Sequence, residues 1–289
     1  MTGSPPPGGP VTSVVAELAP LVITATPNIC WLKPDVAYPQ TPEQRAQEAK
    51  LCQDAGASVL HMHAEDSWAE SIAAVRGASD MVVQCGMSSM AIPERMDVFT
   101  EGADMISIIA SHHDEAFVGV DTNVLHTRQE LEEYALLCRR HTVKPEFEIW
   151  HAGSIWNLQY LIDHGLLDAP YVTTLFFGWP GGTWSPPTLA EYLARRAQLP
   201  EGAVATVSVM GPGQVPLLAA AISQGDHVRV GTEDLPYGRD GAVVATHQLV
   251  GEVAELARAM GRRIATPDEA RAALGIAARP VIASGGEGS

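Results

Sequence analysis

Residues 225–237 read GDHVRVGTEDLPY, a short apolar run that ends in two adjacent acids. His227 to Val230 has the β-branched, apolar character of a buried strand, and Gly231 allows the backbone to turn directly after it. Glu233 and Asp234 follow the turn. The pattern therefore predicts a strand whose carboxyl end carries reactive side chains.

A second stretch ends in a similar way. Residues 57–63 read ASVLHMH, a strand pattern that finishes with His61 and His63. Because side chains alternate along a strand, both imidazoles are expected on one face. A lone His-x-His pair is more often structural, but two histidines and a carboxylate at the end of another strand are a plausible donor set for a divalent metal.

Strand and helix patterns alternate along the whole chain. Strands are expected at 21–26, 57–63, 81–84, 105–109, 145–150, 171–177, 204–209 and 227–230, and helices at 41–56, 67–75, 127–141, 154–164, 189–199, 215–223 and 241–260. This alternation predicts an α/β fold, a single (β/α)8 TIM barrel in which reactive residues gather at the carboxyl ends of the strands. An open doubly wound sheet is the alternative architecture, but no GxGxxG follows the first strand and no P-loop is present.

The composition limits the domain organisation and the partners. The chain has 289 residues, close to the roughly 250 of one barrel. We expect a disordered Pro/Gly-rich arm over 1–18, a barrel over 19–289 and a flexible tail over 278–289. With 18 basic and 34 acidic residues the net charge is −16, which argues against nucleic acid and anionic membranes as partners.

The start of the chain and the cysteines indicate where the protein works. MTGSPPPGGPVTS lacks the basic and apolar regions of a signal peptide, and no apolar run reaches 18 residues, so we expect a cytoplasmic protein. Four widely spaced cysteines without a CxxC pair are expected to be reduced and mostly packed.

The residues at the strand ends resemble a known family. HVRVGTED is similar to the HVRVGLEDN signature of the β-keto acid cleavage enzymes, and the resemblance runs from Val22 to Ile276. Further matches are Thr41-Pro42-Glu43, Ala55-Gly56-Ala57 before HMH, Lys144-Pro145-Glu146 with Glu148, Gly181-Gly182, and ATPDEARAALG near the end.

The resemblance implies a fold and an activity. Members are zinc-dependent (β/α)8 barrels that condense a β-keto acid with acetyl-CoA, by a retro-Claisen route, to give acetoacetate and a new acyl-CoA. Carried onto this chain, the metal ligands are His61, His63 and Glu233, and the reactive acid and its electrostatic partner are Asp234 and Arg229. Members also form homo-oligomers, commonly tetramers, and here a dimer remains an alternative.

The physical chemistry of these roles is independent of the resemblance. Cleaving a C–C bond beside a carbonyl builds negative charge on an enolate oxygen, which Zn²⁺ or another divalent metal stabilises as a Lewis acid. Asp234 can move protons while Arg229 pairs with it or with a substrate carboxylate, although Arg229 can also simply tie down the acid turn. Glu146 and Glu148 share one face of the strand at 145–150 and are further candidate catalytic acids.

Other candidates are assigned to the mouth of the barrel. Gly181 and Gly182, and Gly211 and Gly213, lie in loops that either cradle a phosphate of acetyl-CoA or serve only as turns. Histidines 112, 113 and 151 are either acid/base groups or solvated loop residues. Tryptophans 150, 156, 179 and 184 either line an apolar pocket or pack the barrel rim, and for Trp156 rim packing is the favoured alternative. The candidate substrate contacts are Asn28, Ser88, Ser111 and His151.

The sequence also departs from the family pattern. Two family arginines are missing, since Glu65 and Pro212 stand at the corresponding places, and family hydroxyls after the third strand are replaced by Gly86 and Met87. A bidentate arginine is not replaced by either residue. Three interpretations follow: a cleavage enzyme that uses acetyl-CoA on an unusual keto acid, a metal-dependent lyase or decarboxylase without CoA, and a non-catalytic binding barrel. The first is the expectation, and the keto acid is not identified. The missing arginines also predict weak affinity for acetyl-CoA.

Overall fold

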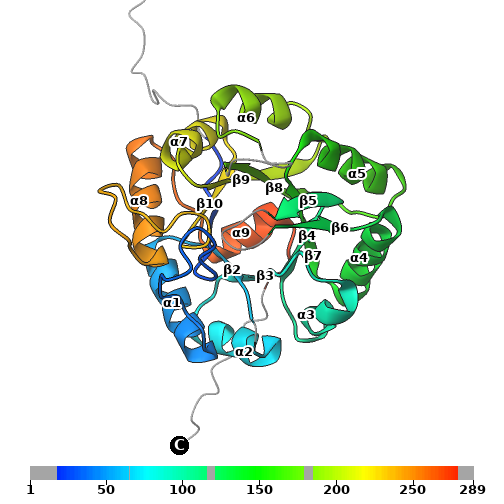
Figure 1. The fold of residues 1–289 in the computed structure, drawn as a ribbon, viewed down its shortest axis with the longest axis horizontal. Coiled ribbons are helices and arrows are strands. Elements are labelled where there is room, and N and C mark those ends of the chain that lie inside the picture. Colours follow the sequence, from blue (N-terminus) through cyan, green and yellow to red (C-terminus); the bar gives the residue numbers. More distant parts are fainter. Residues whose placement is uncertain (1–17, 65, 116–120, 179–184, 279–289) are drawn as a thin grey trace, which may run out of the picture.

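Eight parallel strands close into a barrel with helices around it (Figure 1). The computed structural model describes residues 18–64, 66–115, 121–178 and 185–278. Around the barrel the strand order is β1-β10-β9-β8-β7-β4-β3-β2. The barrel strands are β1 (Ile23–Ala25), β2 (Val59–Met62), β3 (Val82–Cys85), β4 (Met105–Ile109), β7 (Lys144–Ile149), β8 (Tyr171–Gly178), β9 (Ala203–Met210) and β10 (His227–Val230). The expected TIM barrel is confirmed, and the open sheet is excluded.

The helices follow the strands in the order that the alternation predicts. They are α1 (Pro42–Ala55), α2 (Trp68–Ala78), the 3₁₀ helix η1 (Ile92–Arg95), α3 (Met96–Thr100), α4 (Arg128–His141), α5 (Ala152–Asp163), α6 (Leu189–Arg196), α7 (Gln214–Gln224), α8 (Thr246–Ala259) and α9 (Pro267–Leu274). Side-chain oxygens of Ser or Thr cap several amino ends by accepting a hydrogen bond from the third helical N–H, as Thr41 does in a capping box with Gln44. Local chemistry of this kind explains why most helix starts were predicted to within two residues.

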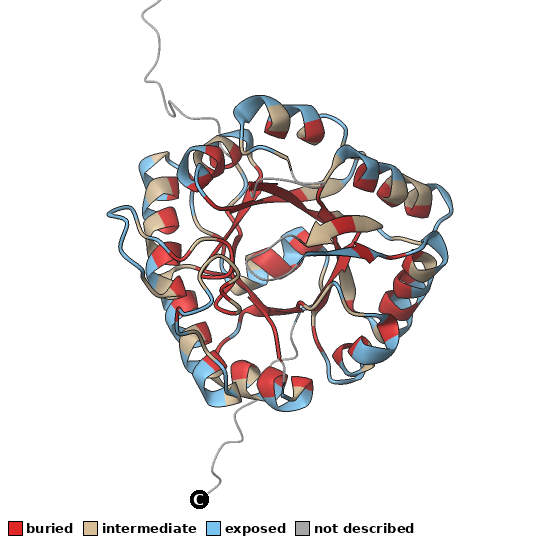
Figure 2. Cartoon of the chain, in the orientation of Figure 1, coloured by how far each residue is buried: buried red, intermediate tan, exposed pale blue. Residues whose placement is uncertain are grey.

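The apolar core lies between the strands and the helix faces that cover them. Figure 2 shows buried strands, and helices whose inner side is buried while the outer side is exposed. At the amino end of the barrel, α9 packs Ala270 and Leu274 against Val22, Val59 and Val82 at the starts of their strands. The carboxyl end is thus the end that remains for chemistry.

A two-stranded hairpin was not predicted. β5 (His112–Glu115) pairs antiparallel with β6 (Thr122–Leu125) between β4 and α4. α3 and α9 were also not predicted as helices. The prediction of one helix over 241–260 was wrong at its start, because Gly238 N–H bonds to Ala242 and the Asp240 carboxylate accepts from Ala242 N–H, which forms a polar turn before α8.

Several predictions concern residues outside the described ranges. These are nearly all of the 1–18 arm and the 278–289 tail, Glu65, Trp179, Trp184, and the glycines Gly181 and Gly182. All four cysteines are described, and each is buried and free, as expected. Among the described residues, no helix combines the length and apolar character that a membrane crossing needs.

Candidate metal centre

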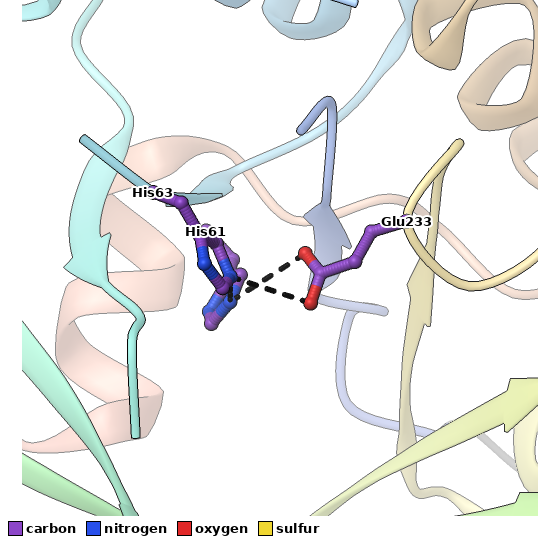
Figure 3. Close-up of side chains that lie close together, drawn as sticks. All are labelled: His61, His63 and Glu233. Carbon is purple, nitrogen blue, oxygen red and sulfur yellow. Dashed lines mark hydrogen bonds and ion pairs between the residues drawn. The ribbon is translucent and has the colours of Figure 1, made fainter. Parts of the chain in front are cut away.

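Three side chains from two strand ends converge at the carboxyl end of the barrel. His61 lies in β2, His63 directly after it, and Glu233 in the turn after β10 (Figure 3). Nε2 of His61 lies 3.1 Å from Nε2 of His63 and 3.6 Å from Oε2 of Glu233. Nε2 of His63 lies 3.4 Å from Oε1 of Glu233. One ligand atom from each residue lies within 4.8 Å of the others, and all three residues are buried. The prediction that both imidazoles share one face is confirmed.

Neighbouring residues hold the outer ring nitrogen of His61 and the backbone of His63. Nδ1 of His61 is 3.1 Å from Oε1 of Gln84, whose amide nitrogen donates to Glu146 at 2.9 Å. That amide orientation makes Gln84 the acceptor and His61 Nδ1 the donor, which leaves Nε2 of His61 unprotonated. Asn28 holds the backbone of His63 through two hydrogen bonds of 2.7 and 3.2 Å. Such outer partners set the tautomer and orientation of metal-binding histidines.

The residues present fit a divalent cation. Oε2 of Glu233 is buried and has no hydrogen-bond partner within the described chain. A Cβ at Gly86, the residue after β3, would lie 2.6 and 2.8 Å from the Nε2 atoms of His63 and His61. Glycine therefore keeps clear the space that the two nitrogens face.

The protonation states agree with this fit. Burial, followed by the charge of Arg229, lowers the pKa of His61 well below its usual value, so the ring is neutral as a metal ligand must be. Burial opposes ionisation of Glu233, but Arg229 and the two imidazoles hold its pKa below the usual range. Glu233 is therefore a carboxylate.

Arg229 connects the two acids of the turn. Its Nη2 donates to Glu233 at 2.7 Å and to Asp234 at 2.9 Å, and its Nε contacts both oxygens of Asp234 at 3.2 Å. Ser208 on β9 donates to Asp234 at 2.9 Å. Burial and the neighbouring Glu233 raise the pKa of Asp234 against the pull of Arg229.

The turn itself depends on Gly231. A Cβ at this position would lie 2.3 Å from the carbonyl oxygen of Thr26 at the end of β1. The close approach of the two strand ends therefore excludes any larger residue.

A cavity of about 80 Å³ opens beside the three candidate ligands. Arg229 lies on its wall, whereas Asp234 is fully buried, contacts Arg229 from behind and is not among the described lining residues. Glu148 also lines the cavity, and its carboxylate accepts a hydrogen bond from the Trp150 indole at 3.0 Å. The other described lining residues are Trp31, Met87, Ser88, Ser89, His113, Glu115, Trp150, Phe176 and Met210.

Not every predicted site residue reaches this cavity. Ser88 lines it, but Asn28 and Glu146 act from behind the histidines, and burial with the charge of Glu148 raises the pKa of Glu146. His151 instead faces the carbonyl oxygen of His112 at 3.1 Å, and Ser111 accepts a hydrogen bond from His126 N–H with its own carbonyl.

Among the predicted glycines and tryptophans that the structure describes, some lie at the cavity and others lie away from it. Gly211 follows β9, and Gly213 borders a separate groove of about 370 Å³ between α7 and α8. Trp150 lines the cavity, but Trp156 is 77% exposed, so the prediction that it packs the rim was wrong.

Sequence reasoning missed several residues of the site. Gln84 pairs in register with His61 on the neighbouring strand, a relation that only the register reveals. Ser208 and Glu115 were also missed, since they come from the middle of an apolar strand and from the unpredicted hairpin.

The sequence matches known proteins along most of its length. The family described as beta-keto acid cleavage enzyme matches residues 20–276. The 3-keto-5-aminohexanoate cleavage enzyme of Acetoanaerobium sticklandii is 31% identical over 281 residues, covering 89% of this chain and 98% of that protein. The 3-dehydrocarnitine:acetyl-CoA trimethylamine transferase of Rhizobium meliloti is 27% identical over 83% of this chain and 91% of its own.

Among solved structures, the apo structure of ObcA aligns with a TM-score of 0.68. The identity is 17%, and the match covers 83% of this chain and 65% of that one. At this identity the likeness supports the barrel fold alone.

Proposed function

The chain belongs to the β-keto acid cleavage enzyme family, and on that premise we propose that it transfers the acyl group of a β-keto acid to coenzyme A. The reaction converts R–CO–CH₂–COO⁻ and CH₃–CO–S–CoA into R–CO–S–CoA and acetoacetate, CH₃–CO–CH₂–COO⁻. The observation that carries the proposal is the buried group of His61, His63 and Glu233 beside a cavity at the carboxyl end of the barrel.

We propose that these three residues hold one Zn²⁺. Two neutral imidazoles and one carboxylate are a zinc donor set that leaves a coordination position open. When bound, the ion supplies Lewis-acid stabilisation of negative charge on a carbonyl or enolate oxygen. Gln84, bonded to Glu146, keeps the ligating nitrogen of His61 unprotonated.

The remaining residues supply charge and proton transfer. Arg229 places a guanidinium on the cavity wall, while its bonds to Glu233 and Asp234 keep that group in one orientation. We assign proton transfer during C–C cleavage to Asp234, which Arg229 and Ser208 hold in place. Glu148, oriented by the indole of Trp150, is the acid that faces the cavity directly.

Acetyl-CoA is the proposed second substrate, held weakly. The loop from Gly211 to Gly213 follows β9, whose last residue Met210 lines the cavity, and its backbone N–H groups are the proposed phosphate contact. Pro212 is exposed in this loop where the family pattern has an arginine. The missing cation favours a second candidate function, a metal-dependent C–C lyase that does not use CoA.

A cytoplasmic homo-oligomer, a dimer or a tetramer, completes the proposal. Trp156 on α5 and Leu136 on the adjacent α4 are 77% and 49% exposed, an apolar surface suited to burial against a second copy. Light scattering is expected to give a multiple of the 30.7 kDa chain mass, and a monomer at micromolar concentration would contradict this part.

The decisive experiment uses the zinc-loaded protein with acetyl-CoA and a panel of β-keto acids. Acetoacetate and the matching acyl-CoA are expected in equal amounts, and keto acid consumption that does not need acetyl-CoA would support the lyase. His61→Ala is expected to lose both metal and activity while the barrel stays folded, because the apolar core does not include the ion. Active wild-type protein without metal would refute the proposed role of the triad.

A further inference from the structure

A cavity of about 210 Å³ lies at the amino end of the barrel, at the opposite end of β7 from Glu148. The last turn of α4, Lys144 at the start of β7, Asp168 in the loop before β8, and the residues after α9 border it. Its volume exceeds the roughly 150 Å³ that holds a benzene molecule. The cavity therefore has room for a small group attached to one of its side chains.

Lys144 is half-buried in the wall of this cavity. Its Nζ donates to the backbone carbonyl oxygen of Asp168 at 3.1 Å. Gly275, which follows α9, contributes no side chain beside the amine, where a Cβ would lie 3.4 Å from Nζ. Burial lowers the pKa of Lys144 against the opposing charge of Asp168, because a desolvated ammonium is disfavoured. A larger share of this amine is therefore neutral than of an ordinary lysine.

The other lysines of the chain have different surroundings. The sequence contains three, Lys33, Lys50 and Lys144. Lys33 lies 2.6 Å from the carboxylate of Asp35, a contact that raises its pKa, and Lys50 pairs with Asp54 one helical turn away. A carboxylate partner favours the charged amine. Lys144 is thus the lysine whose surroundings favour the neutral, nucleophilic form.

The rim of the cavity carries positive charge. Arg139 and Arg140 lie exposed in the last turn of α4, and Arg139 lines the cavity. Arginine is suited to contact the phosphate groups that coenzyme A carries. In a chain with a net charge of −16, this turn gives an acyl-CoA a local cationic surface beside Lys144.

We propose that Lys144 is a site of acetylation by acetyl-CoA, and that the acetyl group occupies this cavity. The neutral amine attacks the thioester carbonyl carbon, so that a C–N bond forms and the C–S bond breaks. The amine proton leaves with the sulfur, which gives Lys–NH–CO–CH₃ and CoA–SH from Lys–NH₂ and CH₃–CO–S–CoA. The inference goes beyond the proposed function, since it needs the thioester but not the cleavage of a keto acid.

The fold accommodates the product. An acetyl group adds three non-hydrogen atoms, fewer than the six of benzene, and its amide N–H still offers a donor to the carbonyl of Asp168. Acetylation removes the charge of the lysine, but the acids of the cavity keep other partners. Asp104 pairs with Arg271 at 3.0 Å, and Asp168 pairs with Arg139 at 3.4 Å. Loss of the ammonium therefore leaves neither carboxylate without a cation.

The test compares the three lysines within one molecule. The zinc-loaded protein is incubated with acetyl-CoA alone over a range of pH, and acetylation of each lysine is followed by peptide mass spectrometry. Lys144 is expected to react fastest at neutral pH, with its rate rising at a lower pH than the rates of Lys33 and Lys50. In urea the three should react alike, because the fold causes the preference. Lys144→Arg should remove the dominant product and leave acetylation of the other two unchanged.

The results that would overturn the inference are equally direct. They are faster acetylation of Lys33 or Lys50 in the folded protein, a pH profile of Lys144 that is not shifted, and a preference for Lys144 that persists in urea.

Asp234→Asn separates this inference from the proposed function. The variant should lose keto acid cleavage but keep the wild-type rate of Lys144 acetylation. If acetylation disappears in this variant, the acyl group passes through the candidate metal centre and the inference is wrong. If the wild type cleaves no keto acid yet acetylates Lys144, the proposed function fails and the inference stands.

Discussion

Replacing Gly86 by alanine tests the proposed metal centre with a single methyl group. The new Cβ would lie 2.6 Å from Nε2 of His63 and 2.8 Å from Nε2 of His61, whereas ordinary contacts begin at 3.4 Å. The imidazoles would have to move by about 0.6 to 0.8 Å, and metal-site geometry tolerates only about 0.5 Å. His61 cannot move freely, because Gln84 holds its other nitrogen at 3.1 Å.

The expected loss is large for metal binding and small for folding. Disturbing even the outer partners of a zinc ligand costs about 10- to 100-fold in affinity. A methyl group between two ligands is expected to cost at least the upper value, or about 2.7 kcal/mol of binding free energy. The backbone bonds of Gly86 to Met62 and Arg95 do not involve its Cα substituent, so the barrel should remain folded.

The assay is zinc titration against a chromophoric chelator, with thermal unfolding measured in parallel. Gly77→Ala is the matched control, because a Cβ at this position in α2 meets nothing within 4 Å. That control should bind zinc normally and gain about 0.5 to 1 kcal/mol of stability from the better helix former. If Gly86→Ala binds one zinc per chain with wild-type affinity, the ion does not lie where these histidines face, and the assignment of the centre is wrong.

Three further perturbations follow from the structure. Asp234→Asn should abolish C–C cleavage yet retain zinc, because the amide keeps the shape but cannot take a proton; cleavage by the variant, measured as acetoacetate release, would exclude Asp234 as the proton acceptor. Pro212→Arg should tighten acetyl-CoA binding by about 10- to 150-fold in calorimetry, and an unchanged affinity would show that the missing arginine does not limit binding. Burial, followed by Arg262, lowers the pKa of His227 to about 4, from about 6.5 in the unfolded chain, so folding stability is present above pH 6.5 and declines as the pH falls toward 4. Between pH 7 and pH 5, His227→Asn should therefore lose about 2 kcal/mol less unfolding free energy than the wild type loses. Equal losses in urea unfolding of the two proteins would contradict this.

The juxtaposition of the three proposed metal ligands could be predicted because strand geometry determines their positions. Alternation along residues 57–63 places His61 and His63 on one face, and parallel strands bring their carboxyl ends together in any barrel. The position of Glu233 follows from the short turn after β10, and Gly231 in the sequence already predicted that turn. The helix starts were predictable for a similar reason, since caps such as Thr41 act within four residues.

The partners of these residues depend on register, which the sequence does not display. Gln84 reaches His61 because β2 and β3 pair at those positions, and Glu146 on β7 reaches Gln84 across the one intervening strand, β4. A shift of one residue in either pairing would turn the amide to the opposite face. Sequence patterns identify which face is buried, but they do not identify which polar residues meet on it.

The hairpin was missed because its strands lack the usual apolar pattern. β5 reads HHDE and β6 reads TNVL, and the buried residues in them are His113 and Val124. A strand of this composition has no hydrophobic face from which to infer its period, so its conformation depends on packing against Trp150 and the barrel mouth. The polar composition that hides the hairpin from sequence analysis also gives it a cavity-facing carboxylate, Glu115. The strand ends of this barrel therefore carry the residues proposed for catalysis, whereas part of the cavity wall comes from a hairpin whose structure the barrel imposes.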